Sequence, residues 1–307
     1  MVGMKSTETA KTMIHDCFPD FAIKHIELAG EGMDSRSFFV NETYVFRFPK
    51  RPKVAEDLKI EIKLLPKLQK GVSLPIPQFE FIGNRKDDLL FVGYKKIEGA
   101  TLSEVWSSAA SDVREKILHS LGIFLKEIHS FPLEEAKKCD VPLHSSRRVY
   151  KGDFLKLAED IKPILSDTVS GFIENLYKEY LSDDRNLSYE PVFLHADFGA
   201  GHIFCDPKDK RVTGIIDFGD IGIGDPDYDL MYLYGEFGWD FILQFLRHYQ
   251  RSDNDLEVLH QKLRLLLVHN TMDDIWMGRD RKEKELEEFA SELLAKRVEK
   301  MRQGIFY

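Results

Sequence analysis

A short segment, residues 192–220, contains the residue types that phosphoryl transfer requires. Asp197 follows the apolar run 192–194, His202 comes five residues later, and Asp217 ends a second apolar stretch. One carboxylate can orient and deprotonate a hydroxyl nucleophile, while another holds Mg²⁺ against the phosphates of a nucleotide. This chemistry depends on positioning and charge, and it needs little covalent help from the protein.

The pattern as a whole is more specific than its parts. With ten histidines in the chain, a lone His-x-Asp is expected roughly once by chance, and a single loop Asp is often a turn residue that bonds its own backbone. The combination His-x-Asp-x4-His, followed by an apolar strand ending in Asp-Phe-Gly-Asp, is a strong signal. We therefore expect a hairpin with strands over 202–205 and 212–216 that brings Asp197, His202 and Asp217 to one rim.

The elements that would position these residues fall into two groups. Alternating patterns in the first hundred residues predict five strands, at 23–28, 37–40, 44–48, 78–82 and 89–97. One helix is expected between the third and fourth strands, from about Val54 to Gln69. Helical patterns then dominate, at 112–130, 152–182 and 228–302. The outline predicts an α+β protein with a small antiparallel β-sheet lobe, residues 1–97, and a larger, mainly helical lobe, residues 98–307.

Composition excludes several classes of protein. Lys and Arg number 43 against 52 Asp and Glu, and the formal net charge of −9 argues against a nucleic-acid or anionic-membrane surface. The three cysteines are far apart and form no Cys-x-x-Cys pair, as expected of reduced thiols. No apolar run approaches the length of a membrane span, and the first residues lack the apolar core of a signal peptide. We expect a cytoplasmic monomer with a small-molecule partner.

Two segments of the chain carry a resemblance to a known family. HADFGAGHIF and GIIDFGDIGIGDPDYDL resemble the catalytic and metal-binding segments of the aminoglycoside phosphotransferases. The upstream stretches YVFRFPK, IEIKLLPKL, LPIPQFEFIG and FVGYKKIEG are similar to the 2''-phosphotransferase branch, in the same order and spacing. The similarity runs from about Phe18 to about His248. It implies a bilobal protein-kinase-like fold, with the nucleotide between the lobes and the acceptor over the helical lobe.

The resemblance also implies roles for individual residues. Asp197 matches the catalytic base, and Asp217 matches the carboxylate that bridges Mg²⁺ to the phosphates. His202 stands at the position of the second metal ligand, where we expect a weak or water-mediated contact because Mg²⁺ prefers oxygen. By the same resemblance, the nucleotide-binding residues are Gly32, Ser35, Arg47, Glu61, Tyr94, Lys95, Ile97 and Ile216.

The resemblance implies more specific roles for three of these positions. Arg47 aligns with the phosphate-binding lysine of kinases, and its guanidinium can bind phosphate with two hydrogen bonds. Glu61 matches its acidic partner, although a glutamate between two lysines can equally belong to a solvated helix face. Tyr94 falls at the gatekeeper position, before a hinge over residues 95–97 that meets the purine. Relatives with tyrosine there tend to disfavour adenine, so we expect GTP as co-substrate, with ATP as the alternative.

Carboxylates beyond the metal-binding segment bear on the identity of the acceptor. An aminoglycoside carries several ammonium groups, so its site requires carboxylates. The predicted acceptor-binding residues are Asp220, Glu236 and Asp240. Three further carboxylates could supply charge from a later helix, although such residues usually form a solvated face: Asp273, Asp274 and Asp280.

Three functions fit these observations. The leading one is an antibiotic kinase that phosphorylates a 4,6-disubstituted aminoglycoside, at the 2'' hydroxyl, with GTP. The second is a kinase of the same fold acting on another small hydroxyl compound such as a macrolide, because the aromatic segment Tyr232–Trp239 would suit an apolar acceptor. The third is a nucleotide-binding module with little catalysis, suggested by Arg47 in place of lysine. Retention of both Asp197 and Asp217 argues against the third.

Overall fold

The computed structural model describes residues 6–85, 89–144, 159–206, 208, 211–249 and 255–304. The chain forms two compact units. Unit 1 comprises Met1–Ser120, Glu134–Val141 and Gly201–Asp220, and unit 2 comprises Leu121–Leu133, Pro142–Ala200 and Ile221–Tyr307. His202 and Asp217 therefore belong to the unit that contains the large sheet, whereas Asp197 belongs to the helical unit.

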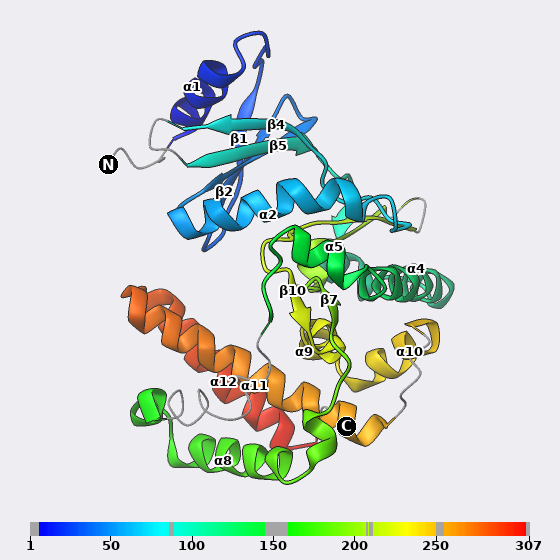
Figure 1. Cartoon of the computed structure of the whole chain (residues 1–307). Helices are drawn as coiled ribbons and strands as arrows, with labels where there is room; N and C mark the ends of the chain where they lie inside the picture. Colours follow the sequence, from blue (N-terminus) through cyan, green and yellow to red (C-terminus); the bar gives the residue numbers. More distant parts are fainter. Residues whose placement is uncertain are drawn as a thin grey trace. The chain divides into compact units, whose positions relative to one another are not determined.

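A five-stranded antiparallel sheet forms the centre of unit 1 (Figure 1), as the alternating patterns predict. Its strands are β1 (Ile26–Glu31), β2 (Ser35–Val40), β3 (Tyr44–Pro49), β4 (Phe79–Asn84) and β5 (Leu90–Lys95), in the order β1-β2-β3-β5-β4. The β2–β3 turn places Asn41 and Glu42 at φ values of 53° and 59°. Asn tolerates this left-handed region better than most residues, which makes a tight connection possible.

Helices α1 (Thr7–Cys17) and α2 (Pro52–Leu68) cover opposite faces of this sheet. The helical spacing in the sequence predicts α2 but not α1. Ala10 and Ile14 of α1 are buried in a cluster with five side chains of the sheet: Phe38, Val40, Phe46, Phe48 and Phe91. Because side chains alternate along a strand, Arg47 points to the other face of β3, where α2 lies.

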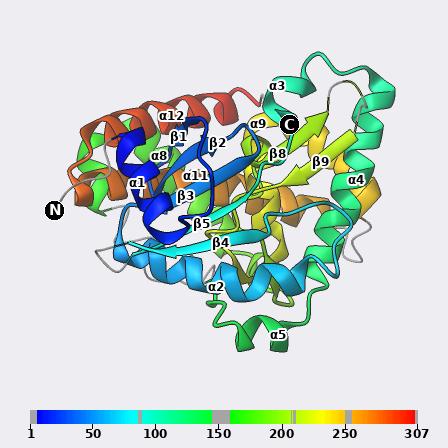
Figure 2. The same ribbon diagram turned by 90° about the horizontal axis from the view of Figure 1, so that it is seen from above.

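The remaining strands of unit 1 form a second sheet, in the order β6-β8-β9. It consists of β6 (Ala100–Thr101), β8 (Ile203–Asp206) and β9 (Arg211–Ile215), and Figure 2 shows β8 and β9 beside α3 (Leu102–Trp106). The predicted hairpin is therefore present. One detail differs, because His202 ends the 3₁₀ turn η3 (Ala200–His202) and the strand begins at Ile203. The small residues before His202 allow the tighter turn, after which Ile203 is buried.

Unit 2 is mainly helical. Its short strands β7 (Val192–Leu194) and β10 (Gly222–Gly224) pair antiparallel. The helices of this part of the chain are α8 (Asp167–Leu181), α9 (Met231–Phe237), α10 (Trp239–Tyr249), α11 (Leu256–Arg281) and α12 (Lys284–Arg302), of which α11 and α12 pack side by side (Figure 1). Helix α4 (Ser111–His129) begins in unit 1 and ends in unit 2, and α5 (Leu133–Lys138) follows it.

One predicted helix, over 152–182, differs from the structure. Residues 152–158 lie outside the described part of the chain. In the described portion, residues 159–161 are α-helical, a 3₁₀ turn, η1 (Lys162–Ile164), follows them, and α8 starts after the N-cap Ser166. Pro163 cannot donate a backbone hydrogen bond, so it interrupts the helical pattern there. Among the described residues, we find no helix with both the length and the apolar character that a bilayer span requires.

Candidate active site

A buried cation on β3 organises the predicted nucleotide side of unit 1. Arg47 forms an ion pair with Glu61 of α2, and its Nη1 lies 3.5 Å from Oδ1 of Asp217. The side chain of Glu61 is only 4% exposed, so Glu61 does not belong to a solvated helix face. Strand β3, helix α2 and the segment after β9 thus bring together three of the predicted site residues.

Burial affects the pKa values of both Glu61 and Arg47. Burial raises the pKa of Glu61 to about 7, against the lowering effect of Arg47. Burial also opposes the charge of Arg47, but Glu61 and Asp217 outweigh it and raise the Arg47 pKa above its ordinary value. Both groups are withdrawn from water, so each depends on the other for stabilisation of its charge. Arg47 is therefore a fixed, permanently charged group.

Tyr94 lies close to this cation. It is buried in β5, where it pairs with Val45 of β3, and its ring contacts Phe79 at a centroid distance of 5.8 Å. Burial raises the pKa of the Tyr94 hydroxyl to about 12, so the phenol stays neutral. Tyr94 is thus a bulky, neutral side chain near the end of β5, and its gatekeeper role stays a prediction.

The other predicted nucleotide-binding residues surround the sheet of unit 1. Gly32 lies in the β1–β2 turn, where its N–H donates to the carbonyl of Ser35, the first residue of β2, at 3.1 Å. Lys50 donates to the carbonyl of Gly32 at 2.7 Å and so ties this turn to the end of β3. A Cβ atom placed on Gly32 would meet only the Ser35 oxygen at 3.9 Å, so the turn surface is open.

The hinge, residues 95–97, contacts the β8–β9 hairpin within unit 1. Lys95 is exposed and pairs with Glu80 at 3.3 Å. Ile97 lies against Gly214 of β9, since a Cβ on that glycine would come within 2.9 Å of the isoleucine side chain. Ile216 follows β9, and its N–H donates to the carbonyl of His202 at 2.9 Å. The hinge is thus attached to the hairpin that carries the predicted metal ligands.

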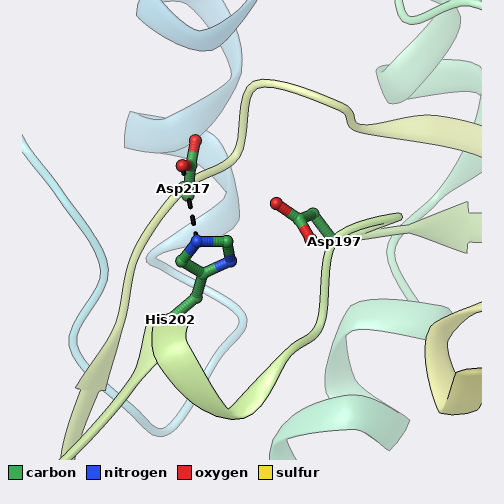
Figure 3. A group of neighbouring side chains, drawn as sticks. All are labelled: Asp197, His202 and Asp217. Atoms are coloured by element: carbon green, nitrogen blue, oxygen red, sulfur yellow. Dashed lines mark ion pairs between the residues drawn. The ribbon is translucent and has the colours of Figure 1, made fainter. Parts of the chain in front are cut away.

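His202 and Asp217 form an ion pair, with His202 Nε2 at 3.7 Å from Asp217 Oδ2 (Figure 3). The Asp217 carboxylate is 45% exposed, and its backbone has a φ of 66°. A partly exposed carboxylate offers the oxygen ligand that Mg²⁺ prefers, whereas an imidazole nitrogen suits Mg²⁺ poorly. The Asp217 carboxylate is therefore suited to hold Mg²⁺, whereas a water-mediated contact from His202 stays a prediction.

Asp197 lies on the loop that follows β7 in unit 2 (Figure 3). The backbone N–H groups of His195 and Ala196 both donate to the Asp229 carboxylate, at 3.0 and 2.6 Å. Asp229 is fully buried, and His129 Nε2 lies 3.0 Å from its Oδ2. The N–H of Asp197 itself donates to His195 Nδ1 at 3.3 Å. Hydrogen bonds to Asp229 and to the His195 ring therefore fix the backbone at and before Asp197.

The carboxylates that could meet a cationic acceptor occupy different settings. Glu236 lies in the last turn of α9 and Asp240 in the first turn of α10. Both are exposed, as is Asp220 in the turn after Asp217. Burial raises the pKa of Asp274 on α11 to about 6, with Arg297 opposing and Asp273 and Asp197 contributing to the rise. Asp274 is therefore not on a solvated face, and the charge of Asp197, in the same unit, acts on it.

Comparisons with known proteins agree with this architecture. A family model described as the phosphotransferase enzyme family matches residues 25–266. Aminoglycoside 3'-phosphotransferase of Escherichia coli is 27% identical over 207 residues, which are 62% of this chain and 70% of the relative. The solved GDP and kanamycin complex of APH(2'')-IIIa has a TM-score of 0.86 and 31% identity, and covers 94% of this chain and 98% of that chain. The streptomycin-ATP-APH(2'')-IIa ternary complex has a TM-score of 0.71 and 27% identity, and covers 99% and 97%.

The fold shared with these neighbours is protein-kinase-like, and the class of protein is a kinase that acts on small molecules. The chain belongs to the phosphotransferase enzyme family, and the predicted resemblance to the aminoglycoside phosphotransferases is confirmed.

Proposed function

We propose that the protein transfers the γ-phosphoryl group of a nucleoside triphosphate, GTP in preference to ATP, to the 2'' hydroxyl of an aminoglycoside. The observation that carries this proposal is the buried ion pair of Arg47 with Glu61, beside Asp217. In this arrangement Arg47 is a fixed cation next to Asp217, the proposed metal-binding carboxylate. A triphosphate requires both a cation and a bound metal to balance its charge. The same pairing argues against a module with little catalysis, because the arginine has the acidic partner expected of the kinase lysine.

On the nucleotide side, each proposed residue acts through position or charge. The turn that contains Gly32 and Ser35 covers the phosphates, and Arg47 donates hydrogen bonds to their oxygens. The hinge residues Lys95 and Ile97, together with Ile216, contact the purine. When bound by Asp217 and His202, Mg²⁺ would neutralise charge on the phosphate oxygens.

On the acceptor side, Asp197 receives the proton of the attacking hydroxyl group. The loop geometry supports this role, since hydrogen bonds from His195 and Ala196 to Asp229 fix the backbone that precedes Asp197. A general base must be held within hydrogen-bond reach of the proton that it removes. The transferred proton leaves Asp197 neutral until product release.

An aminoglycoside is favoured over an apolar acceptor for two reasons. The exposed carboxylates Asp220, Glu236 and Asp240 can attract ammonium groups. The aromatic segment that suggested a macrolide is engaged in packing within unit 2: Trp239 stacks on His260 at 4.4 Å, and the Tyr234 hydroxyl lies 3.1 Å from the same histidine. These aromatic side chains therefore give no specific support for an apolar acceptor.

The test is GDP and ADP release with Mg²⁺ and each triphosphate, in the presence of kanamycin, gentamicin, erythromycin or no acceptor. We expect release that depends on kanamycin or gentamicin, and phosphorus NMR of the product then locates the modified hydroxyl. Release with erythromycin alone would transfer the function to a macrolide kinase. Nucleotide binding without release for any acceptor would contradict the aminoglycoside assignment.

The gatekeeper role of Tyr94 predicts a change in nucleotide preference. Tyr94→Ala removes a buried ring from the end of β5, and opens space where a 6-amino group would lie. We expect the ratio of kcat/KM for ATP to that for GTP to rise by about tenfold. A single steric difference between two substrates in one pocket changes their relative transition-state binding by about 1–3 kcal/mol. Tyr44→Ala, at the start of β3, controls for the loss of an aromatic ring from the sheet. An unchanged ratio in Tyr94→Ala would contradict the gatekeeper role.

A further inference from the structure

A lysine is buried in unit 2 at a point that the proposed mechanism does not use. Lys262 of α11 is 1% exposed, and its Nζ lies 3.0 Å from Oδ2 of Asp225 and 3.0 Å from Oδ2 of Asp227, both of which are fully buried. Burial lowers the pKa of the ammonium group, but the two carboxylates outweigh it, so the Lys262 pKa is raised and the lysine is charged. A buried ammonium group with two buried carboxylates is costly to form, and a well-packed apolar cluster would stabilise a helix contact equally well.

The two carboxylates belong to the 3₁₀ turn η4 (Pro226–Leu230) and its N-cap. The Asp225 side chain accepts the N–H of Asp227 at 3.0 Å, and its carbonyl accepts the N–H of Tyr228 at 3.0 Å. Asp229 lies in the same turn. Lys262 therefore fixes, from α11, the segment that determines where the Asp229 carboxylate lies.

Asp229 in turn determines the conformation of the loop that carries Asp197. Its two oxygens accept the N–H groups of His195 and Ala196. Ala196 has a φ of 64°, a left-handed conformation that a residue with a Cβ rarely adopts. This strained residue directly precedes Asp197, and it persists only where its surroundings impose it.

We infer that Lys262 is a positioning residue for phosphoryl transfer: by binding Asp225 and Asp227 it holds Asp229 against the backbone of His195 and Ala196, and so fixes the direction of Asp197. The inference rests on the proposed function for the role of Asp197. The series of contacts that links Lys262 to Ala196, through Asp225, Asp227 and Asp229, lies entirely within unit 2. This role explains why α11 has a charged residue, not an apolar one, at position 262.

The test compares four variants in the full-length protein by two measurements. Lys262→Met removes the charge, Lys262→Arg keeps it, and Asp227→Asn removes one of its two partners while the pair with Asp225 remains. Leu294→Ala, in the buried core of α12, is the control for a general loss of thermal stability. The first measurement is residue-resolved hydrogen exchange of the His195 and Ala196 amides, without acceptor. The second is the steady-state separation of kcat from KM for GTP and for the acceptor.

In Lys262→Met we expect the two amides to exchange about tenfold faster, since charge-assisted hydrogen bonds are lost or weakened. We expect kcat to fall by about 100-fold, as a displaced reacting group implies, while KM for GTP and the exchange of α8 amides stay unchanged. Lys262→Arg should retain most of the wild-type behaviour. If Lys262→Met does not fold, Asp227→Asn should show smaller changes in the same two measurements.

Unchanged exchange of the His195 and Ala196 amides in a folded Lys262→Met or Asp227→Asn variant would overturn the inference. A fall in kcat no larger than that of Leu294→Ala would also overturn it. Because exchange is measured without acceptor, it tests the positioning by Lys262 even if the wild-type protein phosphorylates none of the compounds. If the wild-type protein phosphorylates none of the compounds, the proposed function is contradicted, and the exchange measurement alone decides the inference about Lys262.

Discussion

Asp197→Asn is expected to lower kcat for phosphoryl transfer by about 1,000-fold, within the range typical of a general base. The amide has almost the shape of the carboxylate but cannot accept the proton of the hydroxyl group. The loop backbone should be preserved, since its hydrogen bonds to Asp229 come from His195 and Ala196 and not from the substituted side chain. GDP release in the presence of saturating kanamycin is the measurement.

Binding of GDP separates this effect from a loss of structure. The residues proposed to bind the nucleotide belong to unit 1, whereas Asp197 belongs to unit 2. Calorimetric titration should therefore give the same GDP affinity for Asp197→Asn and wild type. Asp167→Asn, at an exposed position on α8, serves as the matched control and should leave kcat unchanged. Turnover by Asp197→Asn within about tenfold of the wild-type rate would contradict the assignment of the general base.

The fold could largely be predicted where the pattern is local. All five strands of the large sheet, as well as helices α2 and α4, follow from alternation or helical spacing in their own residues. Helix α1 was missed because only Ala10 and Ile14 are buried among its residues. Their partners are Val40 and the aromatic side chains of β2, β3 and β5, which are distant in the sequence. A two-residue apolar face becomes recognisable only when that non-local surface is known.

The site shows the same division between local and non-local information. The motif identifies Asp197, His202 and Asp217 by type and spacing, but their roles remain predictions. Whether Glu61 is solvated or paired could not be decided from its neighbours, because the answer depends on Arg47, which lies on a strand. The buried Lys262 gave no signal at all, since its two carboxylate partners lie more than thirty residues away in the sequence. Contacts across the fold, not residue types, determine these settings.

Asp217→Asn is the second substitution with a large expected effect. The amide lowers the charge of the proposed Mg²⁺ ligand and removes the attraction to Arg47, whose Nη1 lies 3.5 Å from Asp217 Oδ1. Asparagine is suitable because Asp217 has a φ of 66°, and Asn adopts this left-handed conformation more readily than most residues. We expect kcat to fall by at least about 100-fold, more than is typical for a residue that only supports a metal ligand.

The Mg²⁺ dependence of GDP release distinguishes a metal ligand from a residue that merely orders the segment after β9. Asp217→Asn should need a higher Mg²⁺ concentration for half-maximal activity, because a neutral amide oxygen binds a hard cation less strongly than a carboxylate. His202→Asn is the matched comparison, since the His202 imidazole lies 3.7 Å from Asp217 Oδ2 and we expect it to contact the ion through water. Its loss of activity should be about tenfold or less, with the Mg²⁺ requirement only slightly raised. A wild-type Mg²⁺ requirement in Asp217→Asn would mean that the carboxylate acts through Arg47 and that other groups hold the ion.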